Sequence, residues 1–132
     1  MKPTILATAL LLAGCMAAPN TAGGAEPPRR PPDLPGIAYA QLGETIRVGA
    51  LMVRPRAVVE DSRCPVNVDC VWAGRVVLRI AISGVREERL ISSIEPLLLP
   101  DGGTLVLENV WPPRVHGEAP AGPYRFGFRV AR

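Results

Sequence analysis

Two of the three cysteines in this 132-residue chain, Cys64 and Cys70, lie within residues 60–74, the segment richest in residues that can do chemistry. Paired thiols can form a redox-active dithiol, bind a metal or form a structural disulfide. The spacing is not Cys-x-x-Cys, and no predicted helix follows whose N-terminus would lower a thiol pKa. The only histidine, His116, is remote in the sequence, so the ligand pattern of a zinc site is absent. We therefore expect no catalytic residue, no metal and no cofactor in this protein.

Three carboxylates, those of Glu60, Asp61 and Asp69, fall in the same segment. They could hold a cation or act as an acid–base pair. The interpretation that we favour is structural, with Asp61 and Ser62 accepting backbone N–H bonds in an Asx turn. Arg63 could neutralise these acids, or, if exposed on a braced loop, it could enter a protease subsite as a substrate does. The candidate partner-binding loop consists of Asp61, Arg63, Asn67 and Asp69.

The elements that must position this segment follow a leader-like N-terminus. Residues 1–14 contain one lysine, an apolar run too short to span a bilayer, and then small residues, which is the pattern of a secretory signal peptide. Its end, Leu12-Ala13-Gly14-Cys15, resembles the lipobox of bacterial lipoproteins. The resemblance implies cleavage before Cys15 and a diacylglyceryl group on its thiol, which would anchor the chain to a membrane. The alternative is an ordinary signal peptide followed by an unpaired cysteine.

Residues 15–36 are dominated by proline, glycine and alanine and show no apolar periodicity. Such a segment cannot bury enough apolar surface to offset its conformational entropy, so we expect a disordered, semi-stiff tether. Met16 follows the lipobox cysteine, where an aspartate would resemble an inner-membrane retention signal. The resemblance therefore implies an exported protein that is lipid-anchored to the cell envelope, at the outer membrane and facing the periplasm in a Gram-negative cell.

Residues 37–132 have an apolar period of two and no convincing helical pattern, so we expect a single β-sandwich domain there. The clearest strand covers residues 76–83 and has an inward face of Val76, Leu78, Ile80 and Ile82. Further strands are expected at residues 37–42, 45–53, 56–60, 88–94, 104–111 and 124–130. Prolines, Pro55 among them, are expected between these strands, where they do not interrupt a ladder.

Six or seven short strands separated by turns favour an all-β fold, a small antiparallel β-sandwich whose first and last strands lie near each other. A small β-barrel is the alternative. The last strand places Tyr124, Phe126, Phe128 and Val130 inward. Gly127 lies between the two phenylalanines, which indicates a bulge or the close approach of another strand.

An exported chain folds in an oxidising compartment, and a lipidated Cys15 leaves only Cys64 and Cys70 to pair. We therefore expect one disulfide between them, with Trp72 packed against it in the core. Asp61-Ser62-Arg63-Cys64-Pro65 and Cys70-Val71-Trp72-Ala73-Gly74 together resemble a motif of uncharacterised bacterial lipoproteins and secreted proteins. That resemblance is confined to residues 61–74. It supports the disulfide and the export but implies no activity.

Charge and motif content narrow the function classes. The formal charge is +3, with no basic run and no interleaved aromatic residues, so we expect no nucleic-acid partner. No nucleophile–base motif and no phosphate-binding glycine loop occurs in the sequence. We therefore expect a non-catalytic envelope lipoprotein, attached through Cys15, whose domain binds or stabilises another envelope protein. The alternative is an inhibitor of an exported hydrolase or protease that acts through the Cys64–Cys70 loop.

Overall fold

The computed structural model describes residue 31 and residues 33–132, which form eight β-strands and no helix. The predicted signal peptide, Cys15 and most of the predicted tether therefore lie outside the described residues. A turn, in which the Ile37 N–H donates to the Leu34 carbonyl at 3.2 Å, leads into the first strand. Within the described part of the chain, no segment is a helix of the length and apolarity that crossing a membrane requires.

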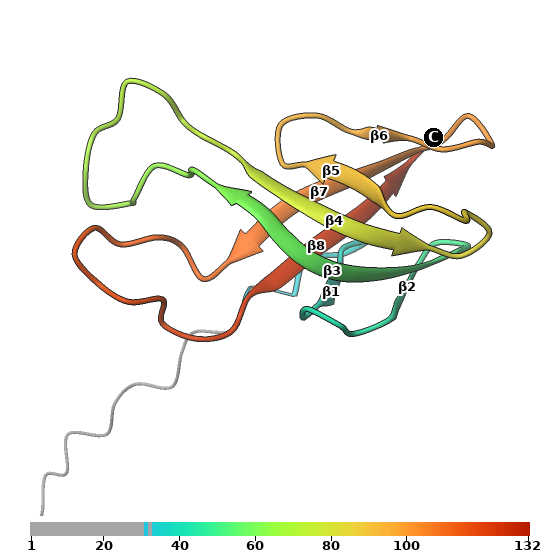
Figure 1. The fold of residues 1–132 in the computed structure, drawn as a ribbon, viewed down its shortest axis with the longest axis horizontal. Helices are drawn as coiled ribbons and strands as arrows, with labels where there is room; N and C mark the ends of the chain where they lie inside the picture. The colour runs from blue at the N-terminus through green and yellow to red at the C-terminus, as the bar shows by residue number, and fades with distance from the viewer. Residues whose placement is uncertain (1–30, 32) are drawn as a thin grey trace, which may run out of the picture.

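Two separate four-stranded antiparallel sheets form a β-sandwich (Figure 1). The first sheet contains, in spatial order, β1 (Ala38–Ala40), β8 (Arg125–Ala131), β7 (Thr104–Trp111) and β6 (Leu97–Leu98). The second contains β2 (Ile46–Val48), β3 (Leu51–Asp61), β4 (Val76–Ile82) and β5 (Arg89–Ser92). The predicted sandwich is confirmed, and β1 pairs with β8, so the first and last strands are neighbours as expected. The barrel alternative is wrong, because the two sheets do not join into one closed sheet.

The core lies between the sheets and is built from alternate residues of the longer strands. Each of the four residues expected on the inward face of β4, Val76, Leu78, Ile80 and Ile82, is at most 5% exposed. Phe126 and Phe128 of β8 are fully buried opposite them, with Leu105 and Leu107 of β7 alongside. Burying each of these large side chains stabilises the fold by about 1.5–3 kcal/mol before entropy is counted. This core fixes the two sheets from which the loops of the candidate site extend.

Gly127 lies between the two core phenylalanines and is itself buried. A Cβ atom at this position would lie 2.7 Å from Asn109 Oδ1 and 2.9 Å from both Ile37 Cγ2 and Tyr39 Cε1. The strand register shifts between Leu107 and Asn109, directly opposite Gly127. The glycine therefore marks both features that its place in the strand suggested, a close approach of neighbouring groups and an irregularity in the ladder.

One predicted strand is a hairpin. Residues 45–53 turn back at Gly49, which has a φ of 60°, so that Arg47 of β2 pairs with Met52 of β3. Val48 is buried, whereas Met52 is exposed on the outer face. The single strand predicted for residues 45–53 is therefore wrong, because the turn divides the segment into two strands with their own alternation.

Pro55 lies inside β3 and not between strands, so the predicted run at residues 56–60 is the second half of β3. The Pro55 carbonyl accepts a hydrogen bond from the Gly43 N–H at 2.7 Å. The nitrogen and oxygen of one strand residue point to the same side, so the missing N–H of Pro55 faces Gly43 and takes no bond from the β3–β4 ladder. The β3–β4 register shifts immediately after Pro55, between Pro55 and Ala57. The two-residue β6 was not predicted.

Candidate functional site

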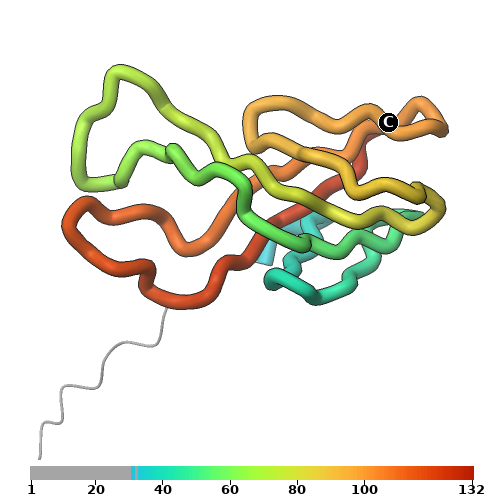
Figure 2. The backbone as a smooth tube through the Cα atoms, viewed as in Figure 1, coloured from blue at the N-terminus to red at the C-terminus, as the bar shows by residue number. Residues whose placement is uncertain are grey.

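Two long loops leave the same end of the sandwich and run beside each other (Figures 1 and 2). The apex loop, residues 62–75, connects β3 to β4 and contains both cysteines of the candidate site. The proline loop, residues 112–124, connects β7 to β8 and begins with the cis peptide bond between Trp111 and Pro112. Both loops extend beyond the ends of the sheets, so their shape depends on contacts that they make with each other.

The base of the apex loop continues the β3–β4 hairpin. The Ser62 N–H donates to the Arg75 carbonyl at 2.8 Å, and the Cys64 N–H donates to the Ala73 carbonyl at 3.0 Å. Gly74 has a φ of 68°, and a Cβ there would overlap the Ser62 carbonyl group and lie 3.0 Å from the Arg63 Cα. Only glycine combines this conformation with this backbone contact, so Gly74 fixes how the loop re-enters β4.

The predicted disulfide between Cys64 and Cys70 is confirmed, with their Cα atoms 5.9 Å apart. Both cysteines lie within the apex loop, so the bond closes a short ring inside the loop and does not connect the two sheets. The tip of the loop is thereby restricted independently of the core.

Contacts with the proline loop hold the apex loop from one side. The Val66 N–H donates to the Arg114 carbonyl at 2.9 Å. Asn67 binds the backbone of His116 twice, accepting from its N–H at 2.8 Å and donating to its carbonyl at 3.3 Å. Arg114 Nη1 donates to the carbonyls of Asp61 and Arg63, both at 3.2 Å. Asn67, a predicted partner-binding residue, therefore joins the two loops.

Asp61 and Arg63 form an ion pair beneath the two loops. Arg63 Nε donates to Asp61 Oδ1 at 2.9 Å, and Arg63 Nη2 donates to Asp61 Oδ2 at 2.8 Å. The Tyr124 hydroxyl donates to the same Oδ2 atom at 2.8 Å. Arg63 Nη1 reaches the carbonyls of Val110 and Pro112 at 2.8 and 3.1 Å. Arg63 is therefore held against the end of β7 and is only 18% exposed. It is not available for the substrate-like insertion that an exposed Arg63 would allow.

Electrostatics keep this carboxylate ionised. Burial acts to raise the pKa of Asp61, but the hydrogen bonds from Arg63 and Tyr124 and the charge of Arg63 outweigh it and lower the pKa to about 2. Burial and the bond to Asp61 raise the pKa of Tyr124. Hydrogen bonds from Ser62 and Arg75 lower the pKa of Glu60. Because Asp61 carries its charge at neutral pH and is bonded to these partners, it serves as a structural anion.

Asp61 and Ser62 also accept backbone N–H bonds. The Arg63 N–H donates to Asp61 Oδ1 at 3.4 Å, and the Arg75 N–H donates to Ser62 Oγ at 3.1 Å. The predicted Asx turn is therefore confirmed for Asp61, whereas Ser62 accepts its backbone bond from across the base of the loop and not within a turn. Glu60 forms a separate ion pair with Arg75 at 3.1 Å, and Asp69 is exposed at the tip, so the three carboxylates do not form one cluster.

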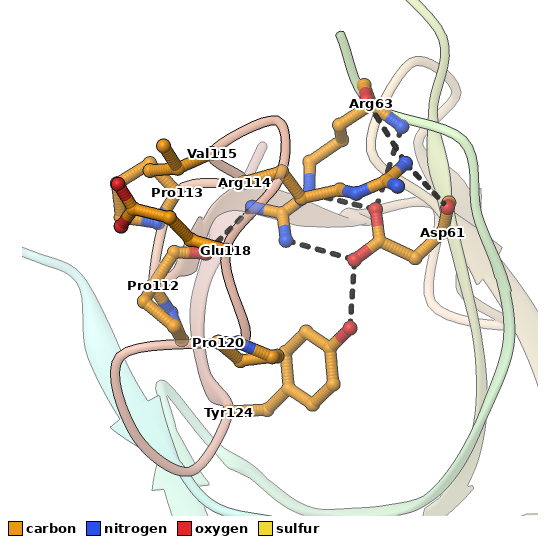
Figure 3. Close-up of a pocket in the computed structure, with 9 residues that line it drawn as sticks. All are labelled: Asp61, Arg63, Pro112, Pro113, Arg114, Val115, Glu118, Pro120 and Tyr124. Carbon is orange, nitrogen blue, oxygen red and sulfur yellow. Dashed lines mark hydrogen bonds and ion pairs between the residues drawn. The ribbon is translucent and has the colours of Figure 1, made fainter. Parts of the chain in front are cut away.

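A pocket of about 290 Å³ opens between the ion pair and the proline loop (Figure 3). Asp61, Arg63 and Tyr124 form its polar floor. Its walls come from the proline loop: Pro112, Pro113, Arg114, Val115, Glu118 and Pro120. The charges of the floor are already paired with each other, so the pocket offers a ligand its proline walls and the rim residues Arg114 and Glu118. Sequence reasoning missed Arg114 and Tyr124 as site residues, because their contacts with Arg63 and Asp61 join residues far apart in the chain.

The tip of the apex loop carries exposed apolar side chains. Val71 is 92% exposed, Trp72 is 82% exposed and Val66 is 70% exposed. The prediction that Trp72 packs against the disulfide in the core is therefore wrong. The loop passes beyond the last core layer, and Phe126 and Phe128 already fill the space between the sheets. Trp72 is thus a surface residue of the loop.

No group of three or more histidine, cysteine, aspartate or glutamate side chains in residues 31 and 33–132 is placed to hold a metal ion. His116 is exposed, and its backbone makes the contacts with Asn67. No model of a protein family, no curated protein and no solved structure matches this chain.

Proposed function

We propose that this protein is a non-catalytic lipoprotein of the bacterial cell envelope that binds a partner protein through the tip of its apex loop. The observation that carries the proposal is the exposure of Val66, inside the disulfide ring, and of Val71 and Trp72, which directly follow Cys70. Tryptophan is enriched among the residues that dominate binding energy at protein interfaces. Exposing it on a braced loop lowers the entropic cost of binding, because little order remains to be gained.

The rest of the proposal comes from the N-terminal sequence. A signal peptide of residues 1–14 and the lipobox ending at Cys15 support export and lipid anchoring, at the outer membrane and facing the periplasm in a Gram-negative cell. The tether of residues 15–36 would give the anchored domain enough reach for the tip to contact a neighbouring envelope protein.

Inhibition of an exported hydrolase or protease is the second candidate. A narrow, disulfide-closed loop that projects from a rigid sandwich suits insertion into a concave active site. The side chains available for insertion are those of Val71 and Trp72, since Arg63 is bound to Asp61 and to backbone carbonyls. An enzyme with an apolar specificity pocket fits this tip better than one that selects arginine.

Mass spectrometry of the mature protein tests the anchor. We expect an N-terminal Cys15 carrying diacylglycerol, and we expect a Cys15→Ala variant to leave the membrane fraction. A variant that remains membrane-bound would contradict lipid anchoring.

In-cell crosslinking to native envelope proteins tests the tip. We expect Trp72→Ala to reduce capture of the main partner at least tenfold, because a central tryptophan contributes about 2 kcal/mol or more to binding at an interface. Leu98→Ala is the matched control, since Leu98 is 75% exposed on β6, away from the apex loop. Equal capture by both variants would exclude the tip as the binding surface.

Rate measurements with exported proteases, with and without the protein, separate inhibition from simple binding.

A further inference from the structure

The outer face of the β2-β3-β4-β5 sheet gathers arginines that are dispersed in the sequence. Arg47, Arg54, Arg56 and Arg79 come from three strands and are all exposed. We call these four residues the arginine face. They alternate with inward residues such as Val48, Val53 and Ile80, so the two-residue period of the strands places their side chains on one side.

Strand register sets how close these arginines lie. Arg47 pairs with Met52, and Arg54 follows two positions later on the same side of β3. Arg54 pairs with Ala81, and Arg79 lies two positions before it on β4. Arg47, Arg54 and Arg79 are therefore diagonal neighbours on adjacent strands, at roughly 7–8 Å between positions. Like charges at this spacing repel each other unless an anion lies against them.

Few acids balance the arginine face. Among the described residues, Glu88 is the acid that pairs with it, lying 3.1 Å from Arg56 and 3.8 Å from Arg79. Residues 33–132 contain twelve arginines and eleven acidic residues, so the domain as a whole is nearly neutral. The arginine face therefore concentrates positive charge while the rest of the domain carries a slight acidic excess.

Two exposed apolar side chains lie among the arginines. Met52 is opposite Arg47, and Leu90 of β5 is opposite Arg79. A surface that mixes arginine with exposed methionine and leucine suits the boundary between lipid headgroups and acyl chains. Single-stranded nucleic acid would require aromatic stacking platforms, and β2, β3, β4 and β5 contain no aromatic residue.

We propose that the arginine face lies against an anionic lipid bilayer and binds its headgroup phosphates. The inference rests on the proposed lipid anchor for bringing the domain to the membrane. The segment between Cys15 and residue 31 extends at most roughly 60 Å, so an anchored domain remains at high local concentration near the bilayer. Each arginine near an anionic surface would then strengthen the contact about fivefold.

Arginine-specific labelling with phenylglyoxal tests this proposal on the mature protein reconstituted into vesicles. One set of vesicles is pure phosphatidylcholine, and the other contains one-third phosphatidylglycerol. We expect labelling of Arg47, Arg54 and Arg79 to slow about fivefold in the anionic vesicles, and to recover in about 1 M salt, where the Debye length is about 3 Å. Arg129, on the outer face of the other sheet, is the internal control and should be labelled equally in both.

Matched variants extend the test. Arg47→Gln/Arg54→Gln should abolish the protection of Arg79, whereas Arg129→Gln/Arg132→Gln removes the same charge and should leave that protection intact. Equal labelling in both kinds of vesicle would overturn the proposal, as would equal protection by inorganic phosphate alone, which would indicate a site for single anions.

Failure of the lipid anchor gives a different result. Protein without lipid on Cys15 would not float with phosphatidylcholine vesicles, yet it should still float with anionic vesicles at low salt through the arginine face. Absence of flotation with anionic vesicles in that case would refute the arginine-face proposal itself.

Discussion

Asp61→Asn should destabilise the fold by removing the central charge between the two loops. The asparagine keeps the shape of the side chain but leaves the Arg63 guanidinium without its carboxylate. In the parent protein the Asp61 side chain is only 10% exposed and the Arg63 side chain only 18% exposed. Breaking one side of a buried ion pair costs about 3–5 kcal/mol. Because Arg63 keeps its bonds to the carbonyls of Val110 and Pro112, we expect a loss of about 2 kcal/mol.

The pH dependence identifies the charge as the cause. The pKa of Asp61 is lowered in the folded protein from 3.8 to about 2, so its contribution is fully present above pH 3.8. That contribution disappears as the pH falls through about 2. At face value the shift corresponds to about 2.4 kcal/mol, and solvent screening at the mouth of the pocket reduces this to about 1–2 kcal/mol.

Urea unfolding of the mature protein and the variant at about pH 7 and about pH 2 measures both quantities. We expect a stability difference of about 2 kcal/mol at neutral pH, equivalent to roughly 10 °C in Tm, and most of it should vanish in acid. Asp69→Asn is the control, since Asp69 is exposed at the tip, and it should change stability by less than about 0.5 kcal/mol. A difference for Asp61→Asn that is equal at both pH values would refute an electrostatic role.

Three further substitutions test the loop and the core. Gly74→Ala should cost more than about 2 kcal/mol in urea unfolding, because its Cβ overlaps the Ser62 carbonyl; a neutral effect would mean that the backbone turns differently there. Cys64→Ser/Cys70→Ser should lower stability by about 2 kcal/mol, as expected for a short closed ring, and its circular dichroism should still report the β-sandwich; a loss of strand signal would show that the disulfide supports the core. Phe128→Ala should cost about 3–5 kcal/mol by thermal melting, and a Tm within a few degrees of the parent protein would place Phe128 outside the core.

The sequence predicted those parts of the fold in which local pattern and burial agree. β4 and β7 lack a competing turn, and alternate residues of β4, Val76, Leu78, Ile80 and Ile82, face the core as expected. The prediction of one strand over residues 45–53 is wrong because the sequence pattern does not distinguish Gly49 in a turn from a glycine within a strand. The prediction for Pro55 is wrong because its place within β3 depends on which side of the strand accepts the hydrogen bond from the Gly43 N–H. No local sequence pattern contains that information.

The candidate site was predicted in part. The disulfide and the turn-forming role of Asp61 follow from residue type and spacing, whereas the bond from the Arg75 N–H to Ser62 does not. The joining of the loops does not, because Arg114 and Tyr124 lie about fifty residues or more from their partners in the sequence. The prediction that Trp72 is buried is wrong for a physical reason. Hydrophobicity favours burial only where a core can accommodate the side chain, and the apex loop extends past the core.

The contacts that hold the apex loop join main-chain atoms to each other and to the side chains of Asn67 and Arg114. Val66 contributes its N–H, Asn67 binds the backbone of His116, and Arg114 binds two carbonyls. The exposed side chains of Val71 and Trp72 take no part in this framework. The tip can therefore exchange its surface residues over evolutionary time without any adjustment of the sandwich beneath it. The apex loop is in this respect a natural grafting site, on which new binding specificities could be selected while stability is conserved.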